Sequence, residues 1–146
     1  MTTHRPHVLF VCVKNGGKSQ MAAGLLRALA GDSVDVSSAG TRPGPALNAQ
    51  SVDALLEVGI DIRDERPRAL DDELVAAADL VVVLGREAEV TSVGGTPVET
   101  WETDEPSERG IEGMDRMRLV RDDIAVRVQR LLARLGSDDD DSGPGA

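Results

Sequence analysis

The sequence has few of the residues that crosslink small proteins or bind metals. Its 146 residues include one cysteine and two histidines. A disulfide within the chain needs a second cysteine, and structural zinc sites normally use four Cys or His ligands. The composition therefore excludes an internal disulfide, and we expect no metal site.

Basic charge and long apolar runs are also lacking. The net charge is −10, and four of the acidic residues form the run Asp138 to Asp141. An acidic chain without a basic stripe predicts no nucleic-acid partner and no membrane partner. No run approaches the ~20 apolar residues of a membrane span, and the first residues lack the apolar core of a signal peptide. We therefore expect a cytoplasmic protein, in which a lone thiol stays reduced.

What is present is a regular alternation of apolar runs and helical patterns. The predicted strands cover residues 8–13, 34–38, 80–84 and 97–101. The predicted helices cover 18–31, 48–59, 70–78 and 114–135, and Asn48 is the expected cap of the second. This alternation predicts an α/β three-layer sandwich with a central, roughly four-stranded parallel sheet. The length fits one domain, which we assign to residues 1–136. Residues 137–146 contain the Asp run, and we expect them to form an acidic, disordered tail.

Both lysines of the chain lie beside its cysteine. The chain has fourteen arginines but only two lysines, Lys14 and Lys18. Both lysines lie in the segment from Cys12 to Ser19, which joins the first predicted strand to the first predicted helix. A thiol at this place is near the positive end of a helix and near loop N–H groups, which favour the thiolate. The two lysines and the Ser19 hydroxyl favour it further. Cys12 is therefore the candidate nucleophile.

The same loop is suited to bind a tetrahedral oxyanion directly above the sulfur. Gly16 and Gly17 allow several N–H groups to point inward, and Asn15 tolerates the left-handed region and can brace the loop. The candidate oxyanion-binding residues are Val13, Lys14, Asn15, Gly16, Gly17 and Lys18.

Three other interpretations of this segment stay open on the residues alone. Cys12 could be a small apolar core residue, and two glycines before a helix could form a simple tight turn. A nucleotide-binding loop is a third interpretation, because Gly17-Lys18-Ser19 matches the end of G-x-x-x-x-G-K-[ST]. The first glycine of that motif is missing, however, since Cys12 stands at its position.

The chain resembles the low-molecular-weight protein tyrosine phosphatase family, and within it the arsenate reductase branch. The family loop is Cys, five residues, Arg, and then Ser or Thr, and here Cys12 and Ser19 match while Lys18 replaces Arg. Residues 38–41 (Ser-Ala-Gly-Thr), 58–61 (Val-Gly-Ile-Asp) and 101–106 (Trp-Glu-Thr-Asp-Glu-Pro) also resemble family segments. The resemblance implies the flavodoxin-like phosphatase fold, a catalytic domain, and roles for Lys18 and Ser19 in catalysis.

Two departures from the family pattern concern the catalytic groups. Lys18 is a point charge where the family has a planar bidentate fork, so its clamp on a phosphoryl group should be weaker. The family's general acid is the Asp directly before Pro. Glu105 occupies that position here and Asp104 precedes it, so either carboxylate is a candidate.

Aromatic and thiol content narrow the function that the resemblance implies. Phosphatases of the family that cleave phosphotyrosine stack its ring between aromatic side chains, but this chain has only Phe10 and Trp101 and no tyrosine. Arsenate reductases recycled by thioredoxin use further cysteines, one of them after the strand at 80–84, where this chain has Gly85. The chain therefore resembles arsenate–mycothiol transferases, which implies an arsenate reductase that hands arsenic to an external low-molecular-weight thiol, with a redoxin acting downstream. Mycothiol is the expected thiol, although glutathione or another thiol would leave the same single cysteine in the sequence.

The expected ligands follow from this interpretation. Arsenate is the substrate, phosphate is a competitor or surrogate, and no tightly bound cofactor is expected. A phosphatase and a catalytically silent oxyanion binder remain the alternatives. For Arg109, Arg116 and Arg118, the simplest expectation is pairing with acids near them in sequence, such as Glu112 and Asp122.

Overall fold

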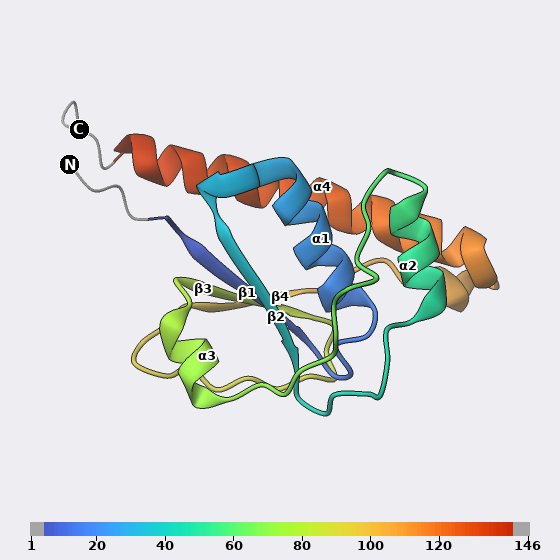
Figure 1. The fold of residues 1–146 in the computed structure, drawn as a ribbon, viewed down its shortest axis with the longest axis horizontal. Coiled ribbons are helices and arrows are strands. Elements are labelled where there is room, and N and C mark those ends of the chain that lie inside the picture. Colours follow the sequence, from blue (N-terminus) through green and yellow to red (C-terminus); the bar gives the residue numbers. More distant parts are fainter. Residues whose placement is uncertain (1–4, 142–146) are drawn as a thin grey trace.

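The computed structural model describes residues 5–141 and has the predicted α/β architecture, a parallel sheet with helices on both faces (Figure 1). The sheet has the strand order β2-β1-β3-β4. Its strands are β1 (His7–Cys12), β2 (Asp35–Gly40), β3 (Leu80–Leu84) and β4 (Val98–Trp101). The chain therefore leaves β1 for one neighbour, β2, and later returns to the other side of β1 as β3. This change of direction places a topological switch point at the end of β1.

The two central strands are the continuous apolar runs of the sequence. Every residue of β3 is buried, and β1 is buried from Val8 to Cys12. The strands pair in parallel register, with Val8 opposite Leu80 and Val11 opposite Val83. Strands covered on both faces need such uninterrupted Val and Leu runs, which is why these two were recognisable in the sequence.

Three helices cover one face of the sheet and one short helix covers the other (Figure 1). The first face carries α1 (Lys18–Ala30), α2 (Ala49–Leu56) and α4 (Gly113–Asp141). Its core packs Phe10 of the sheet against Leu26, Leu55 and Ile124 from these helices. Each such side chain contributes about 1.5–3 kcal/mol when fully buried. The opposite face packs α3 (Asp72–Ala77) and the loops beside it against β1 and β3.

The start of α2 agrees with the predicted capping residue. The Asn48 side chain accepts a hydrogen bond of 2.9 Å from the Ser51 N–H, which confirms Asn48 as the N-cap of α2. Two short 3₁₀ turns, η1 (Gly31–Ser33) and η2 (Pro106–Arg109), were not predicted. The second lies directly after Glu105 and shapes the loop that carries the candidate acids.

The C-terminal boundary differs from the prediction. We expected a disordered tail from residue 137, but the backbone of α4 stays helical to Asp141. The acidic run contains no proline, which would have ended the helix, and the first proline after it is at position 144. The rest of the predicted tail, residues 142–146, lies outside the described residues. Across residues 5–141, no helix is both long and apolar enough to cross a membrane.

Candidate active site

Cys12 is the last residue of β1, and α1 begins six residues later at Lys18. The loop between them lies at the carboxyl end of the parallel strands, at the switch point between β2 and β3. Ligands of doubly wound sheets bind at this place, because the strand ends diverge there and leave an open crevice.

The Cys12 thiol is buried, with 9% of the residue exposed, and has two polar neighbours. Its Sγ lies 2.9 Å from Ser19 Oγ and accepts a hydrogen bond of 3.2 Å from the Asn15 N–H. Both contacts are suited to a sulfur that carries negative charge, because a thiolate is a better acceptor than a thiol. The interpretation of Cys12 as an ordinary apolar core residue does not explain these contacts.

Asn15 braces the loop from within. It is fully buried and holds the left-handed conformation, with φ of 53°, that the sequence analysis allowed for it. Its Nδ2 donates to Ser19 Oγ at 2.8 Å, and its Oδ1 accepts from the Arg68 N–H at 3.0 Å and from Gln20 Nε2 at 3.2 Å. One buried side chain thus ties the loop to α1 and to the segment before α3.

The outer side of the loop is held by residues 41–48. Backbone N–H groups of this segment donate hydrogen bonds of 2.7–3.1 Å to the carbonyls of Cys12, Val13, Lys14 and Gly16. A trans peptide directs its N–H away from its C=O. The N–H groups of residues 13, 14, 15 and 17 therefore point to the inner side of the loop, and that of Asn15 reaches the Cys12 sulfur. This arrangement forms a concave set of donors of the kind that binds oxyanions.

Gly40 allows this packing at the end of β2. A Cβ atom there would lie 2.6 Å from the Val13 carbonyl oxygen and 3.0 Å from the Asn15 backbone nitrogen. Any side chain would push the loop away from the strand. The glycine in the segment 38–41 is therefore a steric requirement of the loop.

Glu105 contacts the loop. Its Oε1 forms an ion pair with Lys18 Nζ, and its Oε2 lies 3.5 Å from Arg116 Nη2 on α4. Among the two candidate acids, Glu105 is the one whose carboxylate contacts a residue of the loop.

Asp104 is bound elsewhere. Arg109 donates to both of its carboxylate oxygens, at 2.8 and 3.1 Å. This hydrogen bonding holds the pKa of Asp104 below its usual value. The Asp104 carboxylate is thus engaged by Arg109, and within the described residues it has no hydrogen bond to the loop from Cys12 to Ser19.

An open cavity of about 740 Å³ lies over the sulfur. Cys12 and the two lysines line one side, Gly85 and Arg86 line another, and both candidate acids lie on its wall. Within the described part of the chain, no aromatic side chain lines it. Trp101 instead packs in the core against Phe10, with ring centroids 5.8 Å apart. Across residues 5–141, no cluster of three or more His, Cys, Asp or Glu side chains is placed to hold a metal ion.

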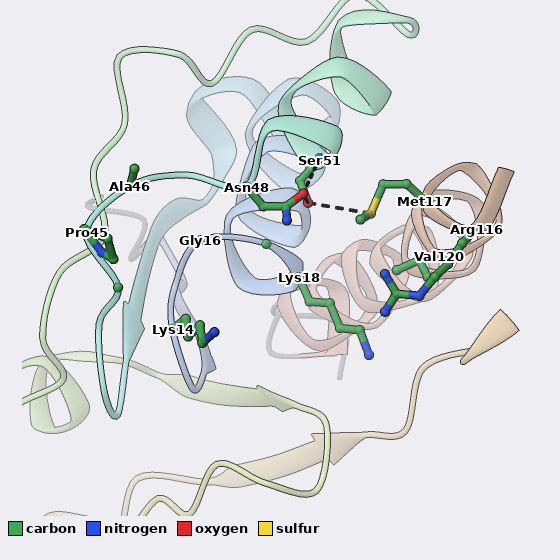
Figure 2. A pocket seen from close by; sticks show the side chains of 12 residues that line it. Lys14, Gly16, Lys18, Pro45, Ala46, Asn48, Ser51, Arg116, Met117 and Val120 are labelled. Atoms are coloured by element: carbon green, nitrogen blue, oxygen red, sulfur yellow. Dashed lines mark hydrogen bonds between the residues drawn. The ribbon is translucent and has the colours of Figure 1, made fainter. Parts of the chain in front are cut away.

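A second cavity of about 380 Å³ lies between the loop, the start of α2 and α4 (Figure 2). Pro45, Met117 and Val120 give it an apolar wall, while Asn48 and Ser51 add polar groups. Lys14, Lys18 and Arg116 line this cavity as well as the cavity over Cys12. The two cavities are therefore adjacent, and the same three cationic side chains line both.

The low molecular weight phosphotyrosine protein phosphatase model matches residues 7–141. The chain belongs to this family. The arsenate reductase of Halalkalibacterium halodurans is 37% identical over 130 residues, which cover 84% of this chain and 91% of that protein. The solved arsenate reductase of Archaeoglobus fulgidus has a TM-score of 0.72 at 31% identity, covering 86% of this chain and 98% of its own.

A second similar solved structure is the thioredoxin-dependent arsenate reductase of Corynebacterium glutamicum. It superposes with a TM-score of 0.79 at 31% identity and covers 94% of this chain. The match spans 65% of that longer chain. Here the thiol content differs from the pattern that the family resemblance implies for thioredoxin-recycled enzymes. Gly85 follows β3 with a φ of 95°, in the cavity over Cys12, and the chain has no second cysteine.

The partners of three arginines around this site differ from the sequence-based expectation. We expected Arg109, Arg116 and Arg118 to pair with acids near them, such as Glu112 and Asp122. Their partners are instead Asp104 for Arg109, Glu105 for Arg116, and Glu57 with Asp115 for Arg118. Only the pairing with Asp115 follows the helical spacing. The others depend on where α4, η2 and α2 meet, which the local spacing of charges does not reveal.

Proposed function

We propose that this chain is an arsenate reductase in which Cys12 attacks arsenate and an external low-molecular-weight thiol takes over the arsenic. The observation that carries the proposal is the hydrogen bonding around the Cys12 sulfur. Its sulfur accepts from the Asn15 N–H and contacts the Ser19 hydroxyl at the base of a loop whose N–H groups point inward. The names of similar proteins, including the Halalkalibacterium halodurans enzyme, support arsenate as the substrate.

In the first step, arsenate binds to the backbone of residues 13–18, and Lys18 and Lys14 balance its charge. The Cys12 thiolate forms a sulfur–arsenic bond as an arsenate hydroxyl departs on the opposite side. Glu105 supplies a proton to this leaving group, so that water leaves rather than hydroxide. Ser19 stabilises the thiolate before this step and again when it is regenerated.

In the second step, the thiolate of the external thiol attacks arsenic and the Cys12–arsenic bond breaks. Cys12 is released as a thiolate, and the product is a conjugate of the external thiol with arsenic that is still pentavalent. A separate redoxin thiol then attacks the sulfur of this conjugate. The two sulfurs form a mixed disulfide, and arsenic leaves with two more electrons as arsenite.

The external thiol is required because the chain cannot complete this sequence with its own sulfur atoms. With one cysteine, no internal disulfide can take up the oxidation. We propose mycothiol as the thiol, since the family resemblance is to arsenate–mycothiol transferases. We also propose a cytoplasmic enzyme without a tightly bound cofactor. Thioredoxin, named for the Corynebacterium glutamicum protein, is the competing electron donor.

The test is arsenate-dependent NADPH oxidation in parallel reactions with mycothiol, glutathione and thioredoxin recycling systems. We expect turnover with the low-molecular-weight thiol and its redoxin, and none with thioredoxin alone. Activity with thioredoxin alone would contradict the external-thiol step. The variant Cys12→Ser is the matched control, and retained reduction by this variant would disprove the nucleophile assignment.

Phosphatase activity is the second candidate, because the same nucleophile and donor set suit a phosphoryl group and the family model is that of a phosphatase. Turnover of phenyl phosphate well above background, with arsenate acting only as a competitor, would favour it. Binding of phosphate or arsenate without turnover in any thiol system would indicate a silent oxyanion binder instead.

A further inference from the structure

The carboxylate of Glu105 lies between two cations from different parts of the chain. Lys18 at the start of α1 pairs with Oε1, and Arg116 of α4 approaches Oε2 at 3.5 Å. Figure 2 shows both side chains extending on the same side of the cavity beside the loop. An anion held between two cations at the mouth of an oxyanion loop is in the position where a substrate anion would gain most from the same charges.

Arg116 has hydrogen-bonding capacity that the protein does not use. Its Nε is buried and has no partner within the described residues, and its contact with Glu105 is at the long limit of a hydrogen bond. By contrast, Arg118 and Arg121 on the same helix each make several hydrogen bonds of 2.7–3.1 Å. Because Nε is covered by protein, an incoming anion would reach this guanidinium at its Nη groups, where the long contact with Glu105 is the one hydrogen bond that the described residues supply.

The position of Arg116 shows which acceptor it can reach. It lines the cavity over Cys12 as well as the cavity beside the loop, and Lys14 and Lys18 share both. The side chain is 28% exposed, so it is open to a ligand but partly shielded from solvent. An anion in the loop would therefore meet Arg116 in addition to the two lysines.

We propose that Arg116 is an oxyanion-binding residue of this active site, and that Glu105 occupies the place between Lys18 and Arg116 until a tetrahedral oxyanion enters. The guanidinium supplies the paired N–H donors that the ammonium of Lys18 cannot present. When the oxyanion takes over both cations, the Glu105 carboxyl is free to face the leaving oxygen. The ligand class is an inorganic arsenate or phosphate ion, and the arsenate part rests on the proposed function.

The test measures the affinity of the whole chain for inorganic phosphate by titration calorimetry, without arsenate or thiol. We expect Arg116→Met to weaken binding about tenfold or more, the usual range for losing a hydrogen bond to a charged group. Arg116→Lys should recover part of the affinity. Arg118→Met removes an arginine of the same helix whose partners lie away from the loop, and it should bind like the wild type. Glu105→Gln should bind phosphate more tightly, because it removes the internal anion.

Several results would overturn the proposal. Wild-type phosphate affinity in a folded Arg116→Met variant would do so, and so would equal losses in Arg116→Met and Arg118→Met. If Arg116→Met does not fold, unchanged or weaker binding in Glu105→Gln would still exclude the internal-anion role. A protein that binds phosphate through Arg116 but never reduces arsenate would contradict only the proposed function. A working arsenate reductase with unchanged phosphate affinity in Arg116→Met would contradict only this inference.

Discussion

Asn15 Nδ2 donates a hydrogen bond of 2.8 Å to Ser19 Oγ, which leaves the proton of that hydroxyl free for another acceptor. Because Oγ already accepts from the amide, its own proton is available for the neighbouring sulfur of Cys12, 2.9 Å away. A thiolate can accept this proton in a hydrogen bond, whereas a thiol competes as a second donor. The buried amide and hydroxyl thus act together to favour the reactive form of Cys12.

Ser19→Ala should therefore make Cys12 less reactive. We expect alkylation by iodoacetamide at neutral pH to slow about tenfold, since a hydrogen bond to a charged group is lost. The rate of alkylation against pH measures the effect. Ser51→Ala is the matched control, because that hydroxyl bonds Asn48 and Met117 rather than the thiol. Equal rates in Ser19→Ala and the wild type would contradict the role of Ser19.

Glu105→Gln and Asp104→Asn should differ sharply in catalysis. Loss of a general acid typically lowers kcat by about 10²–10⁴-fold, and we expect this for Glu105→Gln. Asp104 is held in its ionised form by Arg109, so Asp104→Asn should have a small effect on kcat. Steady-state arsenate reduction provides the measurement. A larger loss in Asp104→Asn than in Glu105→Gln would reverse the assignment.

Lys18→Arg should increase hydrolysis of phenyl phosphate. The guanidinium restores the planar fork that clamps a phosphoryl group in a bidentate manner. An increase would show that the loop from Cys12 to Ser19 already has the geometry for phosphoryl transfer. The Cys12→Ser/Lys18→Arg double variant is the control, and activity that survives in it would come from a contaminant.

Gly40→Ala should destabilise the protein and disturb the loop. The added Cβ would meet the Val13 carbonyl oxygen at 2.6 Å, and overpacking of this kind typically costs about 1–3 kcal/mol. Chemical denaturation gives the free energy of unfolding, and phosphate titration reports on the loop. Gly136→Ala is the matched control, because among the described residues nothing beyond its own stretch of α4 lies within 4 Å of the Cβ position. Wild-type stability and phosphate binding in Gly40→Ala would contradict the requirement for close packing between Gly40 of β2 and the loop.

Glu57 should make stability depend on pH in the acid range. Hydrogen bonds from Arg118, and then from Arg121, lower its pKa from 4.5 to about 2. A carboxyl whose pKa is lower in the folded state stabilises the protein above its unfolded value, and this contribution is lost as the pH falls from about 4.5 to about 2. Thermal unfolding across this range should therefore show a shallower decline for Glu57→Gln than for the wild type. Glu89→Gln, which removes an exposed carboxylate without an ion pair in the described chain, should follow the wild type.

The elements that were predictable from the sequence are those whose signal is local. The apolar run of β3 and the cap at Asn48 are each encoded in a few consecutive residues, and both were found where expected. The loop from Cys12 to Ser19 was also recognisable, because the nucleophile, its glycines and its hydroxyl are contiguous. Segments of this kind reveal their structure before any tertiary contact is known.

The rest of the site depends on contacts between distant segments. Arg116 meets Glu105 because the start of α4 packs against η2, which directly follows Glu105, and Asp104 is bound by Arg109 of the same turn. Sequence spacing predicted helical neighbours for these arginines instead. The helical backbone at 137–141 was missed for the opposite reason, because four consecutive aspartates suggested a tail although the helix continues through them.

Because Cys12 is the one cysteine of the sequence, its repair after oxidation depends on thiols outside the chain. If Cys12 is oxidised to a sulfenic acid, no other cysteine of the chain can trap it as an internal disulfide. Repair must then come from a thiol in solution, before further oxidation to the irreversible sulfinic form. A shortage of thiols would thus leave the nucleophile unprotected, and under the proposed function it would halt turnover as well.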